Sequence, residues 1–324
     1  MTNHTALEAP YLRKRFEYSC KVIDSLRQAM KETVAPLVGQ SPLSVVAVGS
    51  YGRREASCAS DIDFFIVHDG CLPDERLEAI LVQVNAHIRP LSQRGESDHA
   101  KFGRDAFSLY SGLSRQMGWK RESSTALTRR MLLLLEGCSL FGDAAHDHWK
   151  NDLLRRYVPD EQGTGLSRFM LNDLVRYYRT LMANFEEKKA EGKAWGVRNI
   201  KLQFSRKLLF IGGTVVIAEA FGLPAHAKVR RFEYLLAHTP LQRLATIGQS
   251  NEHTEQLFEW YAVFLKLISS AENRQHLDQL SADHALADPV YRQIKAIGNA
   301  FSEKLEQWLR AQYPGHPILH ALCF

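Results

Sequence analysis

The sequence predicts an α+β protein in which a small mixed-sheet domain is followed by an all-helical domain. Two apolar runs separated by a polar, glycine-containing turn lie in residues 44–67 and are typical of two strands, whereas helical periodicity dominates after residue 157. At 324 residues the chain exceeds the usual size of one domain. Proline and glycine punctuate residues 157–165, so we place the domains at residues 1–155 and 156–324.

The composition is that of an ordinary globular protein. Hydrophobic residues make up 45% of the chain and charged residues 24%, values that argue against extended disorder. The longest apolar stretch, residues 208–218, contains two glycines and predicts a buried helix rather than a membrane-spanning one. Residues 1–10 lack the basic and apolar regions of a secretory signal. We therefore expect a cytoplasmic protein without a membrane partner.

The cysteines and the net charge exclude some classes of protein and leave others open. The five cysteines do not form a Cys-x-x-Cys pair, so we expect reduced thiols rather than a disulfide framework or a zinc site. The formal net charge of +5 permits nucleotide or RNA partners without requiring them, since ordinary solvated surface can carry this excess.

Periodicity places the elements of the first domain. Residues 11–38 have apolar side chains at nearly helical spacing, and residues 44–48 form a short apolar run typical of a strand. Helical spacing returns in residues 74–88, which we expect to cover the sheet. Residues 91–121 combine several glycines with single aromatic residues and predict loops, short strands or a broken helix.

Two aspartates at alternate positions, Asp61 and Asp63, predict a metal site. In an extended strand they project from the same face, while Ile62 between them turns toward the core. Two carboxylates held this close repel each other unless a cation lies between them. Mg²⁺ prefers oxygen ligands and is commonly held by one or two carboxylates together with substrate phosphates. We therefore expect Mg²⁺ at Asp61 and Asp63, with Mn²⁺ as a substitute.

The Gly49-Ser50 turn at the end of the first apolar run predicts a phosphate site. Gly49 lets the backbone approach a ligand closely, and the Ser50 hydroxyl with the following amides can donate to phosphate oxygens. Arg53 or Arg54 could also contact phosphate and so bind the nucleotide. Alternatively, one of these arginines pairs with Glu55 and shapes the loop, which is the role that we favour for Glu55.

The pattern G-S-x-G-R-x-E followed by S-D-x-D in residues 49–63 resembles the signature of the DNA polymerase beta-like nucleotidyltransferase superfamily, and especially its PII uridylyltransferase-like branch. In that superfamily the Gly-Ser pair binds the triphosphate of the incoming nucleotide, and the two aspartates hold magnesium ions. The resemblance implies that Gly49 and Ser50 bind the nucleotide. It also implies that Asp61 and Asp63 are the catalytic metal ligands.

A third carboxylate on a later strand is frequent in the superfamily, and this sequence offers several candidates. None of them lies in a clear strand of alternating apolar residues, and a solvated loop acid is the commoner role for any one of them. We name Asp98 as the candidate third metal ligand. The acidic residues in range are Glu96, Asp98, Asp105 and Glu122.

Residues 125–142 resemble the helix that follows the catalytic core in uridylyltransferase-like proteins. From this helix Arg129, Arg130 and Glu136 could reach the nucleotide, although ion pairs on the helix surface are the commoner role. Gly142 is typical of a helix terminus and is expected to end the helix.

Two stripes of polar and cationic residues mark the helices of the second domain. Within each stripe the residues are three or four positions apart and therefore share one helix face. A cation on an apolar face needs an anionic partner, which is either a shared ligand or a carboxylate between the helices, such as Asp173. The stripes are Asn172, Arg176 and Arg179 on one helix, and Arg198, Lys201 and Ser205 on the next.

These helices extend the resemblance to residues 40–215, through the patterns N-D-x-x-R-Y-x-R and R-x-x-K-L-x-x-S-R-K-L. The resemblance implies that Arg176, Lys201 and Ser205 bind the nucleotide from the helical domain. Internal salt bridges between two packed helices are the alternative. Further along, a basic cluster in residues 226–231 could contact an acceptor, although a solvated face is favoured.

Together these features predict a nucleotidyltransferase. A nucleoside triphosphate such as ATP binds to the first domain, an acceptor hydroxyl attacks its α-phosphorus, and pyrophosphate leaves. The second domain is expected to bind nucleotide and substrate. The acceptor stays open among protein, RNA or tRNA, and a small molecule.

Two expectations limit the assignment. PII uridylyltransferases often carry phosphohydrolase HD and regulatory ACT domains, and we expect neither in this sequence, so a role in regulating PII is disfavoured. A catalytically silent nucleotide-sensing or partner-binding protein on the same fold is the alternative function. The presence of both Asp61 and Asp63 argues against silence.

Overall fold

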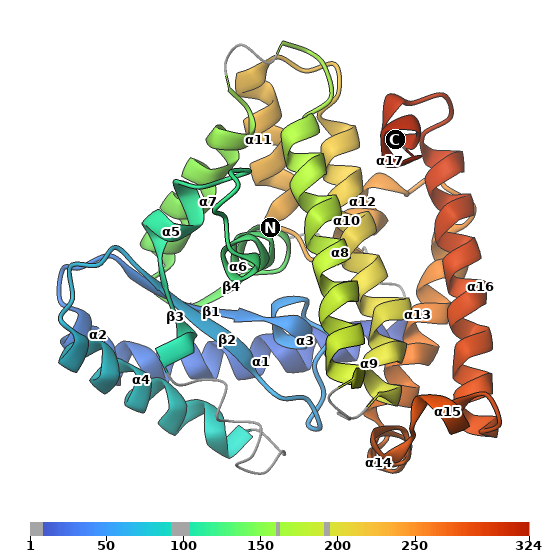
Figure 1. Ribbon diagram of the computed structural model, residues 1–324, viewed down its shortest axis with the longest axis horizontal. Coiled ribbons are helices and arrows are strands. Elements are labelled where there is room, and N and C mark those ends of the chain that lie inside the picture. The colour runs from blue at the N-terminus through green and yellow to red at the C-terminus, as the bar shows by residue number, and fades with distance from the viewer. Residues whose placement is uncertain (1–8, 92–103, 160–162, 191–194, 324) are drawn as a thin grey trace. The chain divides into compact units, whose positions relative to one another are not determined.

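The computed structural model confirms the predicted α+β fold class. Its described residues divide into two compact units. The first unit runs from Lys14 to Tyr157 and contains the sheet, whereas the second is helical and consists of the chain from Val158 onward with the described residues before Lys14 (Figure 1). The structure describes residues 9–91, 104–159, 163–190 and 195–323.

The sheet of the first unit is small and mixed. Its strands are β1 (Leu43–Val48), β2 (Asp63–His68), β3 (Phe107–Leu109) and β4 (Cys138–Phe141). They lie in the order β3-β2-β1-β4, with β1 antiparallel to β2 and β4, and β2 parallel to β3. Val48 pairs with Asp63 in the β1–β2 register. The end of β1 therefore lies beside the start of β2.

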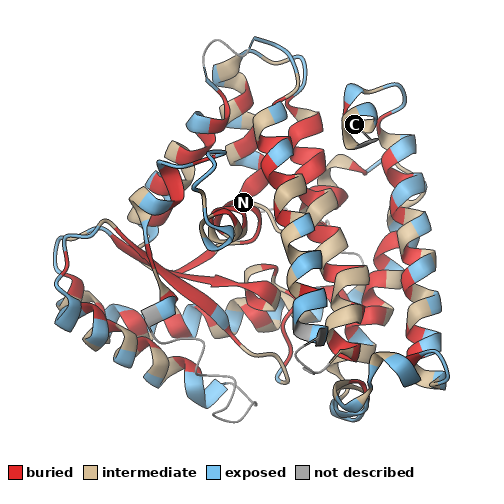
Figure 2. Cartoon of the chain, viewed as in Figure 1, coloured by how far each residue is buried: buried red, intermediate tan, exposed pale blue. Residues whose placement is uncertain are grey.

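Helices α1 (Pro10–Thr33) and α4 (Asp74–Ile88) pack on one face of this sheet (Figure 1). Alternate residues of β1, including Val45 and Ala47, join Ile66 of β2 in the hydrophobic core between the sheet and these helices. Figure 2 shows the strands as an almost continuous buried layer, whereas the outer faces of the helices are exposed. The helix predicted over residues 74–88 is confirmed.

The helix predicted over residues 11–38 is present but is broken near its end. Helix α1 ends at Thr33, and the short helix α2 (Ala35–Val38) follows it. Pro36 lies in the first turn of α2, where its missing N–H removes no helical hydrogen bond. Gly39 then takes a positive φ of 63° before the chain enters β1.

Helices α6 (Ser124–Leu135) and α7 (Asp143–Tyr157) also pack against β1 (Figure 1). The expectation that Gly142 ends a helix is wrong, because α6 already ends at Leu135. Residues 138–141 instead form β4, whose backbone pairs with β1. Gly142, with a φ of 78°, turns the chain from β4 into α7.

Short elements fill the region in which the sequence predicts loops, short strands or a broken helix. The kinds of element in the described residues agree with that prediction. Besides β3 they are the 3₁₀ turns η2 (Arg89–Leu91) and η4 (Arg104–Ala106) and the helix α5 (Tyr110–Ser114).

The second unit is built from helices, as predicted. The apolar stretch at residues 208–218 lies in a buried helix, and Tyr178 packs against Phe210 with ring centroids 4.8 Å apart. None of the helices in the described residues is both long enough and apolar enough to cross a membrane. The helices are α8 (Arg168–Ala190), α9 (Gly196–Lys201), the π-helix η6 (Leu202–Arg206), α10 (Lys207–Glu219), α11 (Ala225–Leu236), α12 (Pro240–Ile247), α13 (Thr254–Ser269), α14 (Ala271–Gln279), α15 (Ala282–Ala285), α16 (Pro289–Gln312) and α17 (Pro317–Cys323).

Candidate active site

The Gly-Ser turn lies at the end of β1 and opens the short helix α3 (Gly49–Gly52). Gly49 has a φ of 67°, a conformation that favours glycine. A Cβ at this position would lie 2.8 Å from Oδ2 of Asp63. The missing side chain therefore lets the turn and the Asp63 carboxylate approach each other closely.

Asp61 and Asp63 keep the alternation that the sequence predicts, although the strand itself begins only at Asp63. Ile62 between them is 3% exposed and belongs to the core. Asp63 is exposed, whereas Asp61 is half-buried and its Oδ1 atom is fully buried. Both carboxylates therefore lie outside the core at the end of the sheet where the Gly-Ser turn is found.

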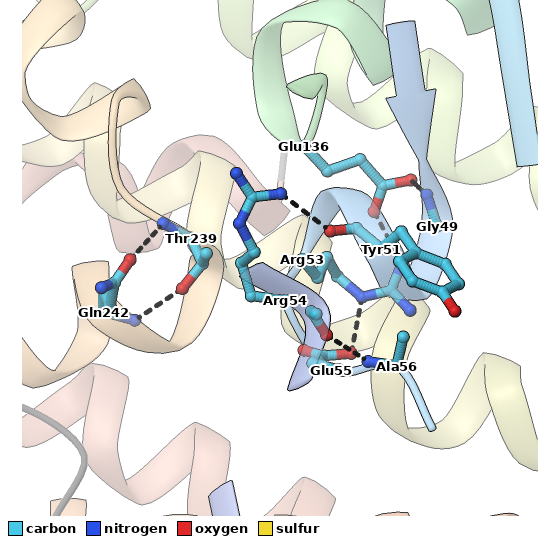
Figure 3. A network of polar contacts seen from close by, with 10 residues as sticks. Gly49, Tyr51, Arg53, Arg54, Glu55, Ala56, Glu136, Thr239 and Gln242 are labelled. Atoms are coloured by element: carbon cyan, nitrogen blue, oxygen red, sulfur yellow. Dashed lines mark hydrogen bonds and ion pairs between the residues drawn. The ribbon is translucent and has the colours of Figure 1, made fainter. Parts of the chain in front are cut away.

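A buried ion-pair network contacts the turn (Figure 3). Glu136, the residue that follows α6, accepts the Gly49 N–H through Oε1 at 2.9 Å. Its Oε2 accepts Arg53 Nη1 at 2.6 Å, and Arg53 Nε donates to Glu55 at 2.8 Å. The side chains of Arg53, Glu55 and Glu136 are 7%, 3% and 0% exposed. One arginine thus neutralises much of the charge of two carboxylates.

The network confirms one of the sequence-based interpretations and corrects another. The pairing of an arginine with Glu55 is confirmed, and the arginine is Arg53. Glu136 does not form an ion pair on the helix surface. Its side chain is buried and accepts a hydrogen bond from the backbone of Gly49. The predicted contact of Arg53 with nucleotide stays a prediction, since two carboxylates already bind its guanidinium.

Two further features hold the segment after the turn. A Cβ on Gly52 would lie 2.3 Å from the carbonyl oxygen of Glu136, so the two backbones meet here without a side chain between them. Arg54 has a φ of 60° and donates through Nη1 to the Tyr51 carbonyl at 3.1 Å. A non-glycine residue in this conformation costs about 1–3 kcal/mol, and such strain is common at ligand sites. The predicted contact of Arg54 with the nucleotide remains a prediction.

The substitution Gly49→Ala should reduce nucleotidyl transfer more than it reduces stability. We expect a loss of about 1–2 kcal/mol in unfolding free energy from the left-handed backbone. The new methyl group would also displace the Asp63 carboxylate, which lies 2.8 Å from its position. Chemical denaturation and a transfer assay measure the two effects. The control is Gly39→Ala, since Gly39 has a similar φ of 63° but nothing within 4 Å of its Cβ position. Equal activity in the two variants would contradict the expected role of Gly49.

The third metal ligand is not found among the described residues. Asp98 lies outside them. Glu122 forms a buried ion pair with Arg130 at 2.6 Å, and the carbonyl oxygen of Asp105 accepts a hydrogen bond from Arg129. Within the ranges that the structure describes, no group of three or more His, Cys, Asp or Glu residues could hold a metal ion. The candidate metal site therefore consists of Asp61 and Asp63.

The donor set of the two aspartates fits Mg²⁺. The ion takes oxygen ligands, needs only one or two carboxylates from the protein, and accepts substrate phosphates and water at its other positions. Asp61 and Asp63 provide carboxylate oxygens beside a turn that has no side chain at Gly49. Phosphate groups would therefore meet backbone and the Ser50 hydroxyl rather than a bulky residue.

The helical unit contains one predicted carboxylate partner. Asp173 is fully buried and binds Arg176 at 2.8 Å on α8, while Arg176 itself is 34% exposed. The expectation that Asp173 meets the cationic stripe is therefore confirmed, but the pair that the structure shows lies within α8 rather than between two helices. Asn172 and Arg179 are exposed on the same helix.

The second stripe differs from its prediction because the helix changes type. The expected alignment of Arg198, Lys201 and Ser205 requires α-helical spacing, but residues 202–206 form the π-helix η6. Ser205 is buried at 3% exposure, whereas Arg198 and Lys201 are half-buried. The predicted nucleotide contacts of Arg176, Lys201 and Ser205 stay predictions.

The basic cluster at residues 226–231 does not form one solvated patch. Lys228 is fully buried, and its Nζ donates to the carbonyl oxygens of Gly163 and Gly165. Burial lowers the pKa of Lys228 below its usual value. Arg231 pairs with Glu219. These cations therefore stabilise the fold of the helical unit.

One comparison with known proteins assigns a family to part of the chain. The comparison with curated proteins finds no significant match. Residues 23–94 match the family model of the nucleotidyltransferase domain. The matched range contains β1, β2 and α4, and with them the Gly-Ser turn and both aspartates. The match supports membership of this region in the polymerase beta-like nucleotidyltransferase superfamily.

Proposed function

We propose that this protein is a metal-dependent nucleotidyltransferase that moves a nucleoside monophosphate from a triphosphate to an acceptor hydroxyl. One observation carries the proposal: Asp61 and Asp63 lie beside the Gly49-Ser50 turn, inside the region that matches the nucleotidyltransferase domain. A transferase-type enzyme with a nucleoside triphosphate substrate follows from the same match. The PII uridylyltransferase-like branch and a cytoplasmic location are parts of this proposal.

The residues of the site have separate roles in the proposed reaction. Ser50 donates a hydrogen bond from its hydroxyl to a phosphate oxygen. Asp61 and Asp63 would hold Mg²⁺ or Mn²⁺, and such an ion would neutralise negative charge that develops on the phosphate oxygens. The acceptor oxygen forms a bond to the α-phosphorus, the bond from that phosphorus to the bridging oxygen of the β-phosphate breaks, and pyrophosphate leaves. The proton of the acceptor hydroxyl passes to solvent. No covalent enzyme nucleophile is needed, because the site mainly positions the reactants.

Residues of the second unit are also proposed to bind nucleotide. Arg176 is 34% exposed while Asp173 binds it, and a partly exposed guanidinium suits an anionic ligand such as a phosphate. Lys201 is half-buried on α9 next to the π-helix, and π-helical turns are frequent at functional sites. Ser205 is the third proposed nucleotide contact from this unit.

Radiolabelled nucleotides test the proposed function directly. The purified protein is incubated with each nucleoside triphosphate labelled at the α-phosphate, with Mg²⁺ or Mn²⁺, and with fractionated lysate. We expect label on an acceptor from an α-labelled nucleotide and none from the same nucleotide labelled at the γ-phosphate. Label on protein, on RNA or on a metabolite identifies the acceptor class. Nucleotide binding without release of pyrophosphate in every fraction would favour the silent sensor instead.

A further inference from the structure

A loop between α5 and α6 presents an exposed tryptophan among cations. We call residues 115–122, Arg-Gln-Met-Gly-Trp-Lys-Arg-Glu, the basic loop. Trp119 is 73% exposed, the highest value among the large hydrophobic residues that are exposed in the described chain. Arg115, Lys120 and Arg121 are also exposed. An indole left in water at this extent, with cations on both sides of it in sequence, suggests a binding surface.

A buried arginine fastens the basic loop at both ends. Arg130 of α6 donates through Nη1 to the carbonyl oxygen of Leu113, just before the loop, at 2.9 Å. Its Nη2 pairs with Glu122, the last residue of the loop, at 2.6 Å, and both side chains are almost completely buried. Arg130 Nε also binds the Tyr157 hydroxyl at 2.6 Å. The loop is therefore held against the core rather than hanging free.

Hydrogen bonds inside the basic loop fix its shape. The backbone N–H of Trp119 donates to the Gln116 carbonyl at 3.1 Å, and the backbone N–H of Glu122 donates to the Trp119 carbonyl at 3.0 Å. Gly118, with a φ of 76°, donates its N–H to the Glu122 carboxylate at 3.3 Å. Glu122 is the only acid of the loop, and it turns inward. The outward face thus carries an indole and three cations.

We propose that the basic loop binds single-stranded nucleic acid. A base stacks on Trp119, and phosphates bind Arg115, Lys120 and Arg121. Single strands expose the faces of their bases, whereas a duplex hides them. A protein partner fits less well, because an aromatic hot spot in a protein interface normally lies in a well-packed patch whose surrounding contacts exclude water. Here Lys120 and Arg121 directly follow Trp119, and the apolar side chain of Met117 is buried.

The position of the loop connects it to the candidate active site. Helix α6 starts just after the loop and is followed by Glu136, which binds the Gly49 N–H. Its 12 residues correspond to a length of about 18 Å. A nucleic-acid strand bound at the loop could therefore reach the Gly-Ser turn, and this strand is the candidate acceptor. This part of the inference rests on the proposed function, whereas binding at the loop does not.

Fluorescence anisotropy with labelled 12-nucleotide strands of uridine or thymidine tests the binding. The two sugars distinguish RNA from DNA, and either result supports the proposal if the single strand binds more tightly than a 12-base-pair duplex. We expect Trp119→Ala to weaken binding about tenfold, since it removes the aromatic face on which a base stacks. Trp119→Phe keeps an aromatic face and should recover most of this loss.

Charge reversal supplies the second arm. The double variant Lys120→Glu with Arg121→Glu should weaken binding and reduce the slope of log K against log salt by about 0.7 for each phosphate that the loop no longer neutralises. The matched control reverses Lys21 and Lys31, two exposed lysines of α1 in the same unit. Equal losses in both double variants would overturn the proposal, as would undetectable binding of every strand by the wild type. Displacement by polyglutamate as effective as by the strands would favour an acidic protein instead and would also overturn it.

A transfer assay with the same strands separates the two proposals. If the strands bind but acquire no label from any α-labelled nucleotide, while another acceptor does, the loop is a binding surface and the strand is not the acceptor. If label reaches a protein or metabolite and no strand binds, the proposed function stands and the basic-loop inference fails. If strands bind and no acceptor of any kind is labelled, the proposed function fails alone.

Discussion

Replacement of Asp61 or Asp63 by asparagine should lower nucleotidyl transfer about a thousandfold or more while the protein stays folded. The metal that these residues are proposed to hold is expected to contribute several kcal/mol to transition-state stabilisation, and each tenfold change in rate corresponds to about 1.4 kcal/mol. Asparagine keeps the size of the side chain but removes the negative charge that binds the cation. Initial rates at saturating Mg²⁺ measure the effect.

Stability should change little in these two variants. Asp63 is exposed and Asp61 is half-buried, and removing one of two neighbouring carboxylates relieves their repulsion. Thermal unfolding measures this. Asp74→Asn is the control, because Asp74 is an exposed carboxylate in the first turn of α4 in the same unit. It should keep full activity. Transfer at the wild-type rate by both Asp61→Asn and Asp63→Asn would refute the assignment of the metal site.

The substitution Glu136→Ala should cause a large loss of stability in the first unit. It removes one of the two carboxylates that bind the buried Arg53 guanidinium. It also removes the acceptor of the Gly49 N–H. Breaking a buried ion pair by removing one partner costs about 3–5 kcal/mol. Chemical denaturation measures the loss. Glu136→Gln should cost less, because the amide oxygen can still accept the Gly49 N–H.

The same substitution should also impair the enzyme in a way that lost stability alone does not explain. A turn that is no longer held at Gly49 misplaces the phosphates, and a shift of about 1 Å can lower kcat/KM about a hundredfold. Glu122→Ala is the matched control, since Glu122 also forms a buried ion pair but precedes α6, whereas Glu136 follows that helix. We expect both variants to be destabilised, and only Glu136→Ala to raise the KM for the nucleotide.

A double-mutant cycle separates charge balance from positioning. Arg53→Met leaves two buried carboxylates without the guanidinium that binds them both. If charge balance dominates, Arg53→Met combined with Glu136→Gln should be less destabilised than the sum of the single variants. Strict additivity in unfolding free energy would show that the two residues act independently and would contradict the network.

Local sequence patterns predict much of the first unit. The spacing of apolar residues is enough to predict α4 with its bounds and the strand at residues 44–48, because helices and strands have short, fixed periods. The alternation of Asp61, Ile62 and Asp63 predicts which of them are outside the core, and the exposures agree. The failures come where a local signal has two interpretations. Gly142 has the backbone of a turn, but it follows a strand rather than a helix.

The partners of the Gly-Ser turn depend on contacts that no local pattern reveals. Gly49 and Glu136 are 87 positions apart in the chain, and their hydrogen bond forms only because β1 and the end of α6 meet in the folded unit. The inward turn of Glu122 toward Arg130 has the same origin, and so does the exposure of Trp119 on a loop fastened to the core. Residue types and their spacing thus indicate the chemistry of Asp61, Asp63 and the Gly-Ser turn. Long-range packing decides which charges are buried beneath that turn and which are left facing water, because burial depends on the whole fold.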